Sequence, residues 1–161
     1  MRLLIILSAF LLFSQAHAQT IEEQWNQLVF EKGGCLTGGQ HVHDGIFGSE
    51  GCVMMNEEWE AFFQNDERDL SFFLIGLMAD TTETHIHTCP FYSARNGEVA
   101  VYALHKIYKI NWYDLEPYQE YRDREITSGT DSHQGWLWAI LEDEEQCELM
   151  KAEWVSRIRM N

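Results

Sequence analysis

Apolar residues recur every three or four positions over most of the chain, a spacing that is typical of amphipathic helices. The first such stretch begins with a capping-box pattern, Thr20 followed three residues later by Glu23, and runs to the glycine pair at 33–34. A second stretch follows Asn56, a good N-cap residue, and has two glutamates in its first turn. The pattern predicts a helix in both places.

Residues 69–79 are apolar almost all the way round, so we expect a central helix there, although a buried strand would show a similar run. A connection at 80–96 follows. The next helix is expected to begin at Asn96, and its apolar spacing places Lys106 and Lys109 on the outer face.

After Trp112 the pattern predicts a short helix that Pro117 disturbs or restarts. Residues 119–131 are charged and weakly patterned, which indicates a surface segment. From 137 to 158 the apolar spacing suits one long helix or two shorter helices with a break near 142–145.

Seven of the 11 glycines lie between residues 33 and 51, which predicts a long loop, either a flexible excursion or a binding loop. Because the rest of the chain shows helical spacing and no convincing alternation, the sequence predicts an all-α fold. We expect an irregular helical bundle of five or six helices with strands of minor importance at most.

The first 18 residues have the pattern of a secretory signal peptide: Arg2, an apolar block at 3–13, and small residues at Ala16 and Ala18. The apolar block is about half of the roughly 20 residues that a membrane-spanning helix needs. We therefore expect residues 1–18 to be removed. Residues 19–161 would then form a single domain, periplasmic or secreted, with no stable membrane insertion.

Charge narrows the possible partners. Removing Arg2 with the leader reduces the basic residues from 11 to 10 against 26 acidic ones, and moves the formal charge from −15 to −16. Such a chain repels phosphate backbones and anionic lipid surfaces. The expected partner is a basic protein rather than a nucleic acid, and the oligomeric state is left open.

An even number of cysteines in an exported chain predicts a disulfide framework. The four cysteines are Cys35, Cys52, Cys89 and Cys147. Of the three possible pairings we favour Cys35 with Cys52 and Cys89 with Cys147, because the first bridge would close the glycine-rich segment.

A local resemblance covers residues 70–115. The stretches Leu74–Ala79, Asp80-Thr81-Thr82, Cys89-Pro90-Phe91 and Gly97–Leu104 are similar to a helical pair of the HEAT-like kind and to segments of small exported bacterial proteins. The resemblance implies two antiparallel helices with a shared buried face. Size, export and charge also make the chain similar, by analogy alone, to periplasmic immunity proteins that protect against type VI secretion effectors.

The densest acidic run gives a candidate docking surface for a basic partner. It consists of Glu142, Asp143, Glu144 and Glu145, and Trp136 and Trp138 precede it closely enough to act as aromatic anchors. A simpler reading is a solvated surface. Protein binding, in the manner of an immunity protein or an inhibitor, is the leading functional prediction.

Two His-x-His pairs support an alternative, a periplasmic metal-binding protein. In an extended segment the members of each pair, His41 with His43 and His85 with His87, would point the same way and could share an ion. The alternative reading is four solvated loop histidines. His105 is expected to be a packed or surface residue, and His133 to belong to a helix cap.

No motif supports catalysis. The chain has no Gly-x-Ser-x-Gly elbow, and its glycine pairs do not continue into a phosphate-binding loop. We therefore predict no catalytic residues, no cofactor and no enzymatic activity, while an active site assembled from isolated Asp, His and Tyr side chains would be invisible to this reasoning.

Overall fold

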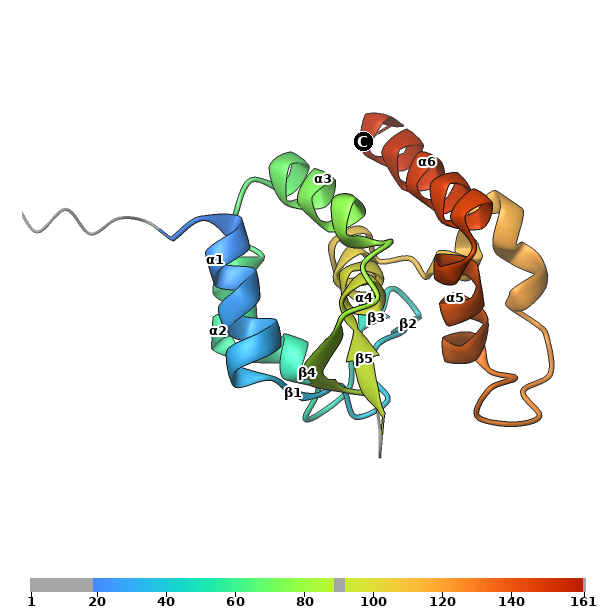
Figure 1. The fold of residues 1–161 in the computed structure, drawn as a ribbon, viewed down its shortest axis with the longest axis horizontal. Coiled ribbons are helices and arrows are strands. Elements are labelled where there is room, and N and C mark those ends of the chain that lie inside the picture. Colours follow the sequence, from blue (N-terminus) through green and yellow to red (C-terminus); the bar gives the residue numbers. More distant parts are fainter. Residues whose placement is uncertain (1–18, 89–91, 161) are drawn as a thin grey trace, which may run out of the picture.

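The computed structural model describes residues 19–88 and 92–160. The expected leader and Cys89 lie outside these ranges. The described residues form six α-helices, and Figure 1 shows α4 in the middle of the molecule, with α1 and α2 on one side and α5 and α6 on the other. The helices are α1 (Ile21–Asn26), α2 (Glu57–Phe62), α3 (Glu67–Leu77), α4 (Asn96–Tyr108), α5 (His133–Glu142) and α6 (Glu144–Met160).

Shorter helical turns extend or connect these helices. A π-helix continues α1, and three 3₁₀ helices lie before α2 and after α4. Their bounds are Gln27–Lys32 for the π-helix and Val53–Met55, Trp112–Asp114 and Glu116–Tyr121 for the 3₁₀ helices.

Two small sheets make the fold mixed, so the all-α prediction is wrong. One sheet has the order β1-β4-β5, with β1 parallel and β5 antiparallel to β4. The other is a hairpin of β2 and β3. The strands are β1 (Gly34–Cys35), β2 (Val42–His43), β3 (Ile46–Phe47), β4 (Glu83–His87) and β5 (Ser93–Arg95).

Strand β4 lies within residues 80–96, where the sequence predicts only a connection. Thr84 and Ile86 point into the core, and the alternate residues Glu83, His85 and His87 are exposed. This is the alternation of a half-buried strand. It is hard to detect because only one of the two inward residues is strongly apolar.

The helix buried on nearly every side is α4. Every residue from Val99 to Leu104 is fully buried, whereas α3 exposes Phe72 and Gly76. The central helix is therefore α4, and the prediction that residues 69–79 form it is wrong. Lys106, expected on an outer face, is buried: its Nζ donates to the Met54 carbonyl at 3.0 Å and pairs with Glu60.

Helices α3 and α4 pack antiparallel. The hydroxyls of Ser71, in the first half of α3, and Tyr108, at the end of α4, lie 2.8 Å apart. At the opposite end, Gly97 lies so close to α3 that a Cβ there would come within 2.2 Å of the Met78 carbonyl oxygen. Only a residue without a side chain permits this approach.

The helix starts follow the sequence signals closely. The Thr20 hydroxyl accepts from the Glu23 backbone N–H, and the Glu23 carboxylate accepts in return from that of Thr20. The Asn56 side chain caps α2 by accepting from the Trp59 N–H. The long C-terminal pattern forms two helices that meet at Asp143, which confirms the interrupted alternative. Among the described residues, no helix combines the length and apolar character needed to cross a bilayer.

We predict that Gly97→Ala lowers the free energy of unfolding by about 1–3 kcal/mol, because the new methyl group overlaps a backbone oxygen that cannot move away freely. Urea unfolding would measure the change. Gly76→Ala is the matched control: nothing lies within 4 Å of its would-be Cβ, so it should stabilise the protein by up to about 1 kcal/mol. Equal effects of the two substitutions would contradict the packing described.

Candidate functional site

The acidic run lies at the corner between α5 and α6. Glu142, Asp143, Glu144 and Glu145 are all exposed. Part of this charge has a local role, because the Asp143 carboxylate accepts from the Gln146 N–H at 2.9 Å and so caps α6. Glu144 and Glu145 occupy the first turn of α6, where negative charge is favourable.

The two candidate aromatic anchors differ in exposure. Trp136 is only 6% exposed. Its indole N–H donates to Asp131 at 2.7 Å, and the guanidinium of Arg124 covers its ring at 4.7 Å. Trp136 therefore stabilises the start of α5 and is unavailable to a partner. Trp138 is half-buried and remains partly accessible.

Trp138 is held on two sides. Its indole N–H donates to the carboxylate of Glu98 on α4, and the guanidinium of Arg95 lies 4.8 Å from the ring centroid. Arg95 in turn pairs with Glu142. These contacts fix the indole in one orientation, which favours a preformed binding surface.

Glu98, which no sequence pattern marks as a site residue, is a fully buried carboxyl group. Besides Trp138, it accepts from the Tyr102 hydroxyl at 2.7 Å, from the Arg95 backbone N–H at 3.3 Å and from Gln134. Burial raises the pKa of Glu98, and the hydrogen bonds from Trp138 and Tyr102 oppose that rise. Buried carboxyl groups with shifted pKa values concentrate at functional sites.

A groove of about 450 Å³ adjoins this carboxyl group. Its lining comes from the residue directly before β5, from the loop before α5 and from α5 itself: Tyr92, Gly129, Thr130, Ser132, Gln134, Gly135 and Trp138. Gln134 and Trp138 both line the groove and hydrogen-bond to Glu98. A buried ionisable group thus supports a surface hollow, an arrangement typical of ligand sites.

The His-x-His pairs do not come together. His85 and His87 share the exposed side of β4, as their spacing predicts, whereas His43 lies in the separate β2–β3 hairpin with His41 directly before it. Across residues 19–88 and 92–160, no three His, Cys, Asp or Glu side chains are placed to hold a metal ion. The structure therefore gives the metal-binding alternative no assembled site.

His41 instead gathers three other histidines. Its ring centroid lies 5.6 Å from that of His133, 6.2 Å from His105 and 6.5 Å from His43. Burial first, and then repulsion from these three rings, lower the pKa of His41 to about 3. The His41 imidazole at the centre of the cluster is therefore uncharged at physiological pH.

His105 fixes the glycine-rich loop to α4. The Trp112 backbone N–H donates to His105 Nε2 at 2.8 Å, so Nε2 carries no proton. Nδ1 must then be the protonated nitrogen, and it donates to the Gln40 carbonyl at 3.0 Å. Burial lowers the pKa of His105 to about 4. Its packed position confirms the sequence expectation.

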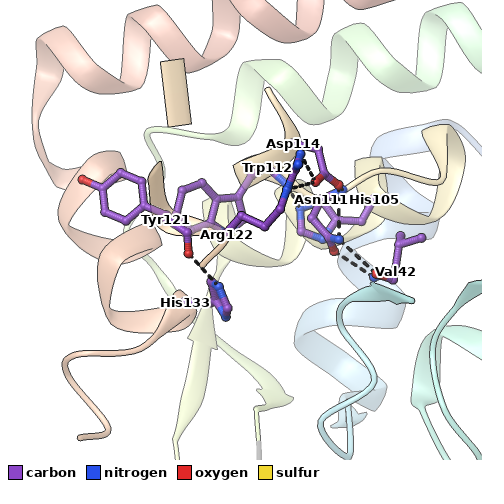
Figure 2. A network of polar contacts seen from close by, with 8 residues as sticks. All are labelled: Val42, His105, Asn111, Trp112, Asp114, Tyr121, Arg122 and His133. Carbon is purple, nitrogen blue, oxygen red and sulfur yellow. Dashed lines mark hydrogen bonds and ion pairs between the residues drawn. The ribbon is translucent and has the colours of Figure 1, made fainter. Parts of the chain in front are cut away.

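Asn111 makes the second attachment of the loop (Figure 2). Its side-chain amide exchanges two hydrogen bonds with the backbone of Val42, donating at 3.0 Å and accepting at 2.8 Å. The Asn111 backbone N–H donates to Asp114, which also pairs with Arg122. The loop is thus anchored by His105 of α4 and by Asn111 of the segment that follows α4.

The predicted two-disulfide framework is wrong. No disulfide joins Cys35 to Cys52 in the described part of the chain, and Cys147 is a buried thiol. Burial raises the pKa of both Cys52 and Cys147, which keeps these thiols protonated and unreactive. Hydrogen bonds to His105 and Asn111 hold the glycine-rich loop in place, the role predicted for the Cys35–Cys52 disulfide.

Comparisons with protein-family models, curated proteins and solved structures gave no match for this chain. The similarity of residues 70–115 to HEAT-like pairs stays a prediction, and so does the analogy with immunity proteins.

We predict that His105 makes stability pH-dependent. Its folded pKa lies below the unfolded value of 6.5, so its contribution is complete above pH 6.5 and declines as the pH falls toward 4. The free energy of unfolding of the wild type minus that of His105→Asn should therefore shrink by about 1.4 kcal/mol per pH unit in this window. Urea titrations of both proteins from pH 7 to pH 4.5 measure the difference; a constant difference would refute the assignment.

A second prediction concerns the buried carboxyl group. Trp138→Phe removes one donor to Glu98 and should lower the free energy of unfolding by about 1–3 kcal/mol at pH 7. In a Glu98→Gln background the same change should cost less, because the amide carries no charge to satisfy. A double-mutant cycle by chemical denaturation measures this coupling, and equal costs in both backgrounds would argue against it.

Proposed function

We propose that the protein is an exported binding module that occludes a cationic protein, such as an effector or a wall-degrading enzyme, in the manner of an immunity protein or inhibitor. The proposal rests on the imbalance between paired basic residues and unpaired acidic residues. Six of the ten basic side chains in the described ranges pair with carboxylates of the same chain, whereas 20 of the 26 acidic side chains have no basic partner there.

Six basic side chains each pair with one carboxylate: Lys32, Arg95, Lys106, Arg122, Arg124 and Lys151. Of the 26 acidic and 10 basic residues in the described ranges, these pairs leave 20 and 4 respectively. Exposed ion pairs add little to the free energy of unfolding. Their main effect is that the acidic residues without a partner dominate the charge of the surface.

The four remaining basic residues gather at one end of the molecule. Arg68 and Arg159 line the same hollow as Tyr108, the last residue of α4. Lys109 follows Tyr108 directly, and Arg157 precedes Arg159 by two positions on α6. Beyond that end, the exposed charge is predominantly negative, and such a surface speeds encounter with a cationic protein.

The corner at 142–145 is the part of this surface that we assign to docking. Glu144 and Glu145 are exposed, have no basic partner among the described residues and lie close in sequence to Glu142, which holds Arg95 against Trp138. The partly accessible Trp138 ring is the aromatic contact nearest to this charge.

The test is affinity capture from the exported fraction of the producing organism, followed by calorimetry with the purified partner. We expect one basic protein bound at 1:1, with an affinity that falls steeply as salt increases. Glu144→Lys combined with Glu145→Lys should weaken binding at least tenfold.

Glu22→Lys combined with Glu57→Lys is the matched control. It changes the net charge by the same amount and also affects exposed glutamates in the first turns of helices. The control should retain binding. Equal loss in both double variants would show attraction by overall charge without a docking site, and failure to recover any basic protein at low salt would overturn the proposal.

A further inference from the structure

The groove beside α5 differs from the rest of the surface because no charged residue lines it. Its seven lining residues are two aromatic residues, two glycines and three residues with hydroxyl or amide groups. In a chain with 26 acidic residues this composition does not suit the cationic partner proposed above. It favours a neutral ligand that is both apolar and rich in hydrogen-bonding groups.

Two aromatic rings line the groove and can contact such a ligand. Tyr92 is 60% exposed and makes no ring contact with any other described residue. Trp138 is oriented by Glu98 on one side and by the Arg95 guanidinium over its ring. A rigid aromatic side chain loses little conformational freedom on binding, which makes it an effective contact surface.

Gln134 supplies a hydrogen-bond acceptor of fixed orientation. Its amide nitrogen donates to the Thr88 hydroxyl at 2.6 Å and its side chain also hydrogen-bonds to Glu98. A carboxylate only accepts, so the nitrogen of the amide must face these two partners. The side-chain oxygen has no hydrogen bond within the described residues and remains for a ligand hydroxyl.

We propose that this groove binds a neutral saccharide. A sugar ring presents apolar C–H groups on its face, which pack on aromatic rings, and hydroxyl groups around its edge, which match the Gln134 oxygen and the Thr130 hydroxyl. The volume of about 450 Å³ lies within the range of about 300–1,000 Å³ that is typical of small-ligand sites. The inference stands independently of the cationic partner.

Neutral oligosaccharides are the probes: the tetrasaccharides of N-acetylglucosamine, of β-linked glucose and of α-linked glucose, titrated into the full mature chain. Calorimetry should show 1:1 binding of at least one of them, with a change in tryptophan fluorescence. Because the groove is uncharged, the affinity should be nearly the same at 50 mM and 500 mM salt.

Two variants act on the groove alone. Tyr92→Ala removes an exposed ring and should weaken binding at least tenfold, and Gly129→Trp should abolish it by filling the groove from a position with open space around it. Phe72→Ala, an exposed aromatic residue on α3 outside the groove, is the control and should bind as the wild type does.

Absence of binding at millimolar concentrations of all three sugars would overturn the proposal, as would equal affinities of Tyr92→Ala and the wild type. If Tyr92→Ala instead weakened capture of the basic protein while no sugar bound, the groove would belong to the protein interface. That result would reject the saccharide site and leave the proposed protein-binding function standing.

Discussion

The structure depends on satisfying three ionisable side chains that the central helix α4 carries into the core. Glu98, His105 and Lys106 are each almost completely buried. A buried polar group without a partner is costly, so each of them requires a neighbouring segment to supply one. Glu98 accepts a hydrogen bond from the indole N–H of Trp138 on α5. His105 accepts from the backbone N–H of Trp112 and donates to the Gln40 carbonyl. Lys106 donates to the Met54 carbonyl and pairs with Glu60 of α2. The packing around α4 is therefore specified by polar contacts as well as by apolar area.

The same constraint explains how the glycine-rich segment is ordered without a disulfide. Leu36, Val42 and Phe47 are buried, so the segment contributes its own apolar residues to the core. Its backbone attachments at Gln40 and Val42 are made by His105 and Asn111. A tether of hydrogen bonds to neutral side chains is sensitive to protonation, unlike a covalent bridge.

Much of the helical framework could be predicted because its signals are local. The capping box at Thr20, the cap at Asn56 and the break before Glu144 depend only on neighbours in sequence. The hairpin of β2 and β3 also has a local sequence signal, the dipeptide Asp44-Gly45 between two short segments that each contain an apolar residue. Both turn residues have positive φ, as a tight hairpin turn requires. The burial of Lys106 and Glu98 could not be predicted. Helical spacing gives the position of a charged residue on its helix, but it does not reveal the partner that a distant segment of the chain places beside that residue.

Glu98 connects the two surfaces to which we assign functions. From it a continuous set of contacts runs through Trp138 and Arg95 to Glu142 at the acidic corner. A cationic partner that competed with Arg95 for Glu142 would remove one of the two restraints on the Trp138 ring, and that ring lines the uncharged groove. Occupancy of the corner by such a partner would then change the shape of the groove. If both sites are occupied as proposed, each ligand should change the affinity for the other by the same factor.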